Sequence, residues 1–167
     1  WCHNPESRMA EPQRSVKHLQ LDGRCFPREE ITGREISVSE LVEEVKRDFI
    51  FYRESGGGVT LSGGEPLYQP DFCKAILKSL KQERLHTALD TTGYASKEVI
   101  LDILPFTDLF LYDLKIMDNS IHQKHTGVSN QLIFSNLKLL FENRKEVIIR
   151  IPVIPGITDT ETNIQDI

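Results

Sequence analysis

The sequence predicts an α/β fold, a partial (β/α) barrel of parallel strands with outer helices that contains about four β/α units. From residue 37 onward, short and nearly continuous apolar segments alternate with longer segments whose apolar residues recur at helical spacing. Strands that are apolar on both faces and separated by helices are typical of parallel sheets covered by helices. Because a closed barrel of this class has eight such units, about four units predict an open sheet.

Local signals mark where the predicted elements begin and end. Ser37 and Glu40 form a capping-box pattern at the start of the first helix, and the glycines at 56–58 end it. Pro70 suits the first turn of the second helix. The predicted helices span 37–54, 70–84, 96–104, 129–143 and a last segment from about 159; the predicted strands span 59–62, 87–91, 109–113 and 147–151, with a polar loop between 113 and 129.

The chain has 167 residues, enough for one domain that buries a core, and we expect that domain to extend over 1–167. The repeated β/α units occupy 37–167. Residues 5–36 have weak hydrophobic periodicity, so they are predicted to form an irregular connection that leads into the first helix.

Composition excludes several classes of function. The formal net charge is −5 and no run of Lys and Arg is present, which argues against a nucleic-acid partner. No apolar run approaches the roughly 18 residues of a membrane-spanning helix, so no membrane association is expected. Three cysteines without regular spacing are typical of a reducing compartment, and the predicted location is the cytoplasm.

Polar and charged residues follow all of the predicted strands at the point where each strand ends. The carboxyl ends of parallel strands meet at one edge of a sheet, and this edge is the usual ligand site of α/β folds. The convergence of these residues therefore predicts a binding site there. They are Gly63, Gly64 and Glu65 after the first strand, Asp90 and Thr91 in the second, Asp113 and Lys115 in the third, and Arg150 in the fourth.

Each of these residues also has a purely structural interpretation. Gly63 with Gly64 could form a simple turn at the end of a strand. Asp113 and Lys115 lie two residues apart, so on a strand their side chains point to the same face and could pair only with each other. Arg150 could be an ion-pair partner. The structural interpretation is plausible for each residue alone and much less so for all of them together.

Short motifs spread over nearly the whole chain resemble one known family. They are Trp1-Cys2-His3-Asn4-Pro5-Glu6-Ser7, Thr60-Leu61-Ser62-Gly63-Gly64-Glu65-Pro66-Leu67, Leu89-Asp90-Thr91-Thr92-Gly93-Tyr94, Asp113-Leu114-Lys115-Ile116-Met117-Asp118, Thr126-Gly127-Val128-Ser129-Asn130 and Arg150-Ile151-Pro152-Val153-Ile154-Pro155-Gly156. Together they resemble the radical S-adenosylmethionine (SAM) superfamily, and within it the activating enzymes of glycyl radical enzymes.

The resemblance implies an oxidoreductase in which three cysteine thiolates hold a [4Fe–4S] cluster. The reduced cluster would pass an electron to SAM, and the resulting 5′-deoxyadenosyl radical would take hydrogen from a backbone glycine of a partner glycyl radical enzyme. A flavodoxin or ferredoxin would supply the electron. No side chain is required as a general acid or base, because the cofactor performs the difficult step.

The resemblance also implies roles for individual residues. Gly63, Gly64 and Glu65 would accept hydrogen bonds from the ammonium group of SAM through main-chain carbonyls and the Glu65 carboxylate. The other implied roles are Cys2 as the third cluster ligand, Trp1 near the adenine, His3 and Asn4 along the SAM-facing loop, Asp90, Thr91 and Asp113 around the SAM carboxylate through a bound monovalent cation, and Lys115 and Arg150 at carboxylate or ribose oxygens.

The sequence departs from the family pattern at its start. The first two cluster cysteines are absent, and Cys25 and Cys73 lack the spacing to replace them. Residues 1–36 are therefore expected to be the end of the cluster loop followed by the irregular connection. The chain is expected to be a fragment lacking both ends that does not cleave SAM by itself. The alternatives are another radical SAM enzyme, such as the activase of anaerobic ribonucleotide reductase, and a non-catalytic scaffold without a cluster.

Overall fold

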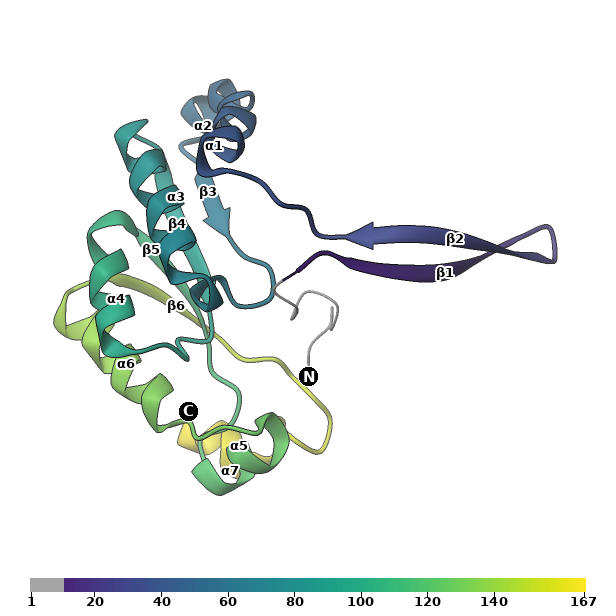
Figure 1. Cartoon of the computed structure of the whole chain (residues 1–167). Helices are drawn as coiled ribbons and strands as arrows, with labels where there is room; N and C mark the ends of the chain where they lie inside the picture. The colour runs from purple at the N-terminus through teal and green to yellow at the C-terminus, as the bar shows by residue number, and fades with distance from the viewer. Residues whose placement is uncertain (1–10) are drawn as a thin grey trace.

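The computed structural model describes residues 11–167, which form a parallel sheet covered by helices and a separate two-stranded ribbon (Figure 1). The sheet has four parallel strands in the order β3-β4-β5-β6, which is also their order along the chain. This arrangement confirms the predicted α/β fold and the open sheet. The strands are β3 (Gly58–Leu61), β4 (His86–Thr91), β5 (Leu109–Asp113) and β6 (Glu146–Arg150).

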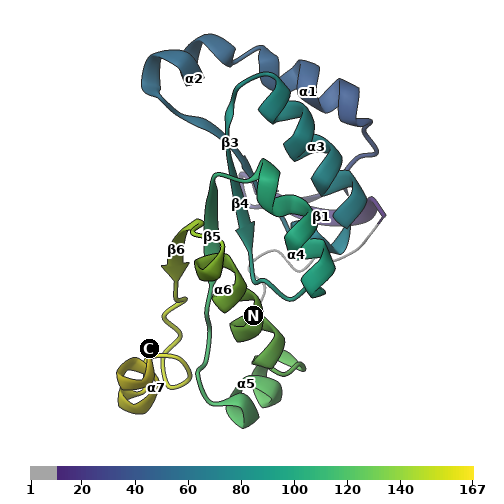
Figure 2. The same cartoon turned by 90° about the vertical axis from the view of Figure 1, so that its left-hand side faces the viewer.

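The helices α3, α4 and α6 cover one face of the sheet, as Figure 2 shows by placing them in front of the strands. The core lies between these helices and the sheet, where Leu89 and Phe110 of the strands pack against Leu77, Ile100 and Leu140, all fully buried. The helices are α1 (Val38–Lys46), α2 (Phe49–Ser55), α3 (Pro70–Gln82), α4 (Lys97–Ile103), α5 (Asn119–Thr126), α6 (Gln131–Glu142) and α7 (Glu161–Asp166), with 3₁₀ turns at Pro66–Tyr68 and Leu104–Phe106.

Two helical segments differ from the prediction. The expected helix over 37–54 is two helices, because the N–H groups of Arg47 and Asp48 donate to carbonyls three residues earlier and tighten the end of α1. The predicted polar loop after β5 contains α5. The signals for α5 were present in the sequence, since Asp118 caps its N-terminus through a hydrogen bond from Ile121 N (2.7 Å) and Gly127 ends it.

The prediction of an irregular connection is wrong for residues 13–32. These residues form an antiparallel hairpin of β1 (Gln13–Leu21) and β2 (Arg24–Thr32), which projects away from the sheet (Figure 1). The turn consists of Asp22 and Gly23, both with positive φ (48° and 74°), as a two-residue type I′ turn requires. No residue of either strand is buried, so the hydrophobic alternation that marks a half-buried strand is weak, and the Asp-Gly pair was the usable signal.

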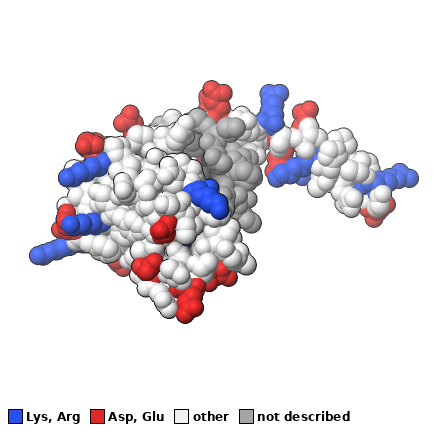
Figure 3. All heavy atoms as spheres, turned by 90° about the horizontal axis from the view of Figure 1, so that it is seen from below, with Lys and Arg blue, Asp and Glu red and all other residues white. Residues whose placement is uncertain are grey.

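The surface of this ribbon is mixed in charge. Figure 3 shows both basic and acidic side chains along it. Lys17 and Glu30 form an ion pair across the two strands (2.8 Å). Near the turn, Leu19 and Phe26 face each other across the strands and are both exposed.

A half-buried ion pair beside β4 predicts a pH dependence of stability. Asp108 accepts hydrogen bonds from Thr87 N (2.9 Å) and from Lys81 Nζ (2.8 Å). Burial alone would raise the pKa of Asp108, but the hydrogen bonds and charge from Lys81, together with the bonds from Thr87, lower it below the ordinary value. A lowered folded-state pKa gives stability that is complete above the unfolded pKa and is lost as pH falls through the folded pKa.

We therefore expect Asp108→Asn to lower the free energy of unfolding by about 1–2 kcal/mol at pH 7. The difference from wild type should shrink as pH falls below about 4, where the wild-type carboxylate becomes protonated in its turn. Urea unfolding followed by circular dichroism between pH 7 and pH 2.5 measures the free energy of unfolding of both proteins. A difference between them that stays constant over this range would contradict a lowered pKa of Asp108.

Candidate functional site

The carboxyl ends of the four parallel strands bring a cluster of charged side chains together. Arg150, at the end of β6, donates to Asp113 Oδ1 from both Nε (3.0 Å) and Nη2 (2.8 Å), and its Nη2 also contacts Asp90 of β4. Ser62, which follows β3, donates to Asp90 Oδ2 (2.9 Å). Lys115 Nζ lies 3.8 Å from Asp113 Oδ2. Residues at or just after the ends of all four strands therefore meet at one edge of the sheet.

The cluster balances its own charge. It contains two carboxylates and two cations, and Arg150 bridges both carboxylates. Burial alone would lower the pKa of Arg150, but the hydrogen bonds and negative charge of Asp113, followed by those of Asp90, raise it above the ordinary value. The Arg150 side chain is still 40% exposed, so water reaches the cluster and a ligand could approach it.

The loop after β3 is held by Glu65. Its Oε1 accepts hydrogen bonds from Leu67 N (3.1 Å) and Thr91 Oγ1 (2.7 Å). Its Oε2 accepts from Thr92 N (2.9 Å) and Thr92 Oγ1 (2.6 Å). The carboxylate thus points toward the end of β4 and connects the Gly63-Gly64 loop to the neighbouring strand.

The loop after β4 is in turn fixed to the core. Gly93 N donates to Thr91 Oγ1 (2.9 Å), and the Gly93 carbonyl accepts from Asn136 Nδ2 (2.9 Å), which also donates to Ala95 O (2.7 Å). Asn136 lies in α6 and is buried, so this loop is bonded to a helix of the covering layer. Tyr112, fully buried on β5, donates to Ile133 O of the same helix (2.7 Å).

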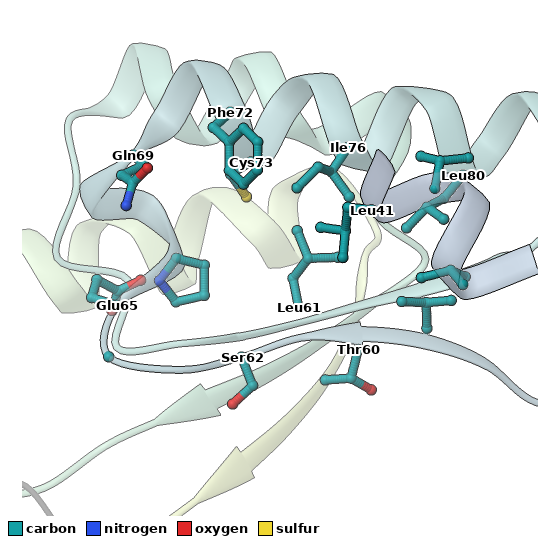
Figure 4. Close-up of a pocket in the computed structure, with 15 residues that line it drawn as sticks. Leu41, Thr60, Leu61, Ser62, Glu65, Gln69, Phe72, Cys73, Ile76 and Leu80 are labelled. Carbon is teal, nitrogen blue, oxygen red and sulfur yellow. The ribbon is translucent and has the colours of Figure 1, made fainter. Parts of the chain in front are cut away.

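A hollow of about 430 Å³ lies on the helical side of β3, between this strand, α1 and α3. Figure 4 shows Leu61 pointing into it among Leu41 and Ile76, while Thr60 and Ser62 point to the opposite side of the strand. The lining is mainly apolar. The hollow therefore lies next to the charged cluster, and it shares with the candidate site Ser62 and the loop that carries Glu65.

The described residues do not hold an iron–sulfur cluster on their own. Cys25 is exposed on the ribbon, and Cys73, a residue of α3, is buried. Burial, with a smaller contribution from the charge of Glu65, raises the pKa of the Cys73 thiol to about 12, so it is not the thiolate that a cluster needs. Within residues 11–167, no three side chains of His, Cys, Asp or Glu are grouped as metal ligands.

The structure locates most of the predicted site residues. Asp90, Asp113, Lys115 and Arg150 form the cluster. Thr91 follows Asp90 in β4, and its hydroxyl bonds to Glu65 of the Gly63-Gly64 loop. Ser62 and Thr92 were not predicted to belong to the site. Both carry a hydroxyl group and lie within the motifs at the strand ends, and their place in these motifs was the signal by which sequence reasoning could have found them. Trp1, Cys2, His3 and Asn4 lie outside the described residues.

The fold and the cluster define a (β/α) domain with charged side chains gathered at the carboxyl ends of its parallel strands. The chain matches the model of the "Radical SAM superfamily" over residues 1–165, and it belongs to that superfamily. This confirms the predicted superfamily, and membership of it implies a [4Fe–4S] cluster and SAM as cofactors. No helix within residues 11–167 has the length and apolar character needed to cross a membrane.

The chain is similar to several activating enzymes. It is 44% identical over 135 residues to the choline trimethylamine-lyase activating enzyme of Oleidesulfovibrio alaskensis, covering 81% of this chain and 44% of that protein. It is 47% identical over 137 residues to the trans-4-hydroxy-L-proline dehydratase activating enzyme of Clostridioides difficile, covering 81% and 45%. The chain thus spans less than half the length of these relatives.

A solved structure agrees with the fold. A domain of the pyruvate-formate lyase-activating enzyme from Bacteroides vulgatus superposes with a TM-score of 0.60 at 43% sequence identity. The superposition covers 65% of this chain and 68% of that domain. Both comparisons support the predicted branch of the superfamily, the activating enzymes.

Proposed function

We propose that the complete gene product is a glycyl radical enzyme activase, which cleaves SAM reductively and takes hydrogen from a backbone glycine of a partner enzyme. The observation that carries this proposal is the charged cluster formed by residues of all four strand ends in a radical SAM domain. A [4Fe–4S] cluster, when bound, would supply the electron for SAM cleavage. A reducing cytoplasm suits such a group, and a flavodoxin or ferredoxin is the proposed donor.

The residues of this chain would bind and orient SAM. Carbonyls of Gly63 and Gly64 suit an ammonium group, which only donates hydrogen bonds. Lys115 and Arg150 are the cations available at the strand ends for the SAM carboxylate or ribose oxygens. We assign Cys2 as a cluster ligand, Trp1 to the adenine, and His3 and Asn4 to the SAM-facing loop, on the family resemblance.

A monovalent cation beside the SAM carboxylate is a further part of the proposal. The oxygens that would bind it belong to Asp90, Thr91 and Asp113, and the guanidinium of Arg150 now bridges the two carboxylates. Because one bridging position cannot hold both cations, we infer that a monovalent cation enters only when Arg150 moves away. The Asp90–Asp113 pair is charge-compensated without it.

The proposal is tested with the complete gene product, reconstituted anaerobically with iron and sulfide. Reduction in the presence of SAM should release 5′-deoxyadenosine and methionine, and the matched variant Cys2→Ala should lose both the cluster absorbance and the products. Adding a glycyl radical enzyme should give an organic radical signal in electron paramagnetic resonance. A reconstituted protein that binds no iron would favour the scaffold alternative; SAM cleavage with a radical only on anaerobic ribonucleotide reductase would favour the other activase.

A further inference from the structure

The carboxylate of Glu65 has no hydrogen-bonding capacity left for a ligand. A carboxylate has two oxygens with about four acceptor positions between them. Oε1 accepts hydrogen bonds from Leu67 N and Thr91 Oγ1, and Oε2 accepts hydrogen bonds from the N–H and the hydroxyl of Thr92, so all four acceptor positions are filled. All four donor–acceptor distances lie between 2.6 and 3.1 Å, so these are well-formed bonds to a charged acceptor.

We propose that Thr92, together with Thr91, is a positioning residue for SAM. The two threonines hold Glu65 and thereby fix the Gly63-Gly64 loop, so that the main-chain carbonyls, and not the Glu65 carboxylate, accept the hydrogen bonds of the SAM ammonium. This inference rests on the proposed function, because it assumes that SAM binds at this loop. It differs from the role that the family resemblance implies for the carboxylate of Glu65.

The anchor behind the two threonines is rigid. Thr91 is 2% exposed, and its hydroxyl oxygen also accepts a hydrogen bond from Gly93 N. The Gly93 carbonyl is bonded to the buried Asn136 of α6. The Gly63-Gly64 loop is therefore connected, through Glu65 and the end of β4, to a helix of the core. Such support restricts the loop to one conformation before a ligand arrives.

The charge of Glu65 is left uncompensated for a cationic ligand. Among the ion pairs within residues 11–167, none includes Glu65. Its negative charge is felt at its neighbours, since it adds to burial in raising the pKa values of Cys73 and Tyr112. Glu65 can therefore attract the ammonium through space while all of its hydrogen bonds are directed inward.

The test compares two ligands in the complete, reconstituted protein by equilibrium dialysis: S-adenosylhomocysteine and its deaminated form, which lacks the ammonium. Thr92→Val keeps the branched shape and removes the hydroxyl donor. It should raise the Kd of S-adenosylhomocysteine about tenfold and leave the Kd of the deaminated ligand within about twofold. Thr92→Ser, which retains the hydroxyl, should restore binding. Thr32→Val, in strand β2 of the ribbon, is the matched control and should change neither Kd.

Different outcomes overturn different claims. Equal binding of S-adenosylhomocysteine by Thr92→Val and wild type would overturn the positioning role and leave the proposed function standing. Equal losses for both ligands would also overturn it, because a general loosening of the site does not depend on the ammonium. Failure of wild type to bind either ligand would overturn the proposed function itself. If Thr92→Val does not fold, Thr92→Ala, which also removes the hydroxyl donor, replaces it and should show the same ammonium-dependent loss.

Discussion

Gly93→Ala is expected to destabilise the domain by more than about 3 kcal/mol, or to prevent folding altogether. A Cβ atom at residue 93 would lie 1.7 Å from the hydroxyl oxygen of Tyr112 and 2.2 Å from its Cζ. Tyr112 cannot move aside, because it is fully buried and its hydroxyl donates to Ile133 O. The backbone of Gly93 also has φ +71°, a conformation that L side chains rarely adopt. Urea unfolding followed by circular dichroism measures the loss.

The matched control is Gly23→Ala in the hairpin turn. Gly23 has nearly the same φ, +74°, but no atom lies within 4 Å of a Cβ built there. This substitution should cost only the backbone strain, about 1–2 kcal/mol, and should affect the ribbon alone. Similar losses for the two alanine variants would show that the close approach of Tyr112 is not what requires glycine at position 93.

Arg150→Met is expected to destabilise the domain by about 1–2 kcal/mol at neutral pH and to create a cation site. The variant leaves Asp90 and Asp113 without the guanidinium that bridges them. Because these carboxylates are 21% and 28% exposed, water screens their repulsion and limits the loss. Replacing choline chloride with potassium chloride at equal ionic strength should raise the melting temperature of the variant and not that of wild type.

The control for this variant is Arg150→Lys, which keeps a positive charge near the same carboxylates. It should show no specific response to potassium and a smaller loss of stability. A potassium-specific rise in the melting temperature of wild type would contradict the inference that Arg150 occupies the bridging position, since it would mean that the monovalent cation and the guanidinium bind together.

The elements that could be predicted from sequence are those with a buried face. β5 was predicted with the bounds that the structure has, 109–113, because a strand covered by helices has a nearly continuous apolar sequence. The hairpin and α5 were missed for the opposite reason. The hairpin buries neither face, and α5 is mostly polar, with His122 as its one buried residue. Their signals were confined to a few residues, Asp22 and Gly23 for the hairpin and Asp118 and Gly127 for α5.

That the candidate site residues converge was predictable from the sequence, and their individual contacts were not. The rule that ligands bind at the carboxyl ends of parallel strands brought Asp90, Asp113 and Arg150 to one edge, where they lie. The ion-pair alternative for Arg150 also describes an actual contact. The direction of the Glu65 carboxylate could not be predicted, because it depends on hydroxyl and N–H donors 26 and 27 residues away in the chain. Such a contact exists only after β3 and β4 have paired.

The order of the strands in the sheet has a consequence for how the chain assembles during synthesis on the ribosome. Each of β4, β5 and β6 pairs with the strand immediately before it in the sequence. When a new strand emerges, its partner has therefore already been made, and no strand after β3 has to wait for a later segment. Each crossover also brings the helix that covers the new pair. The sheet can thus grow in one direction, one β/α unit at a time, without undoing a pairing already formed.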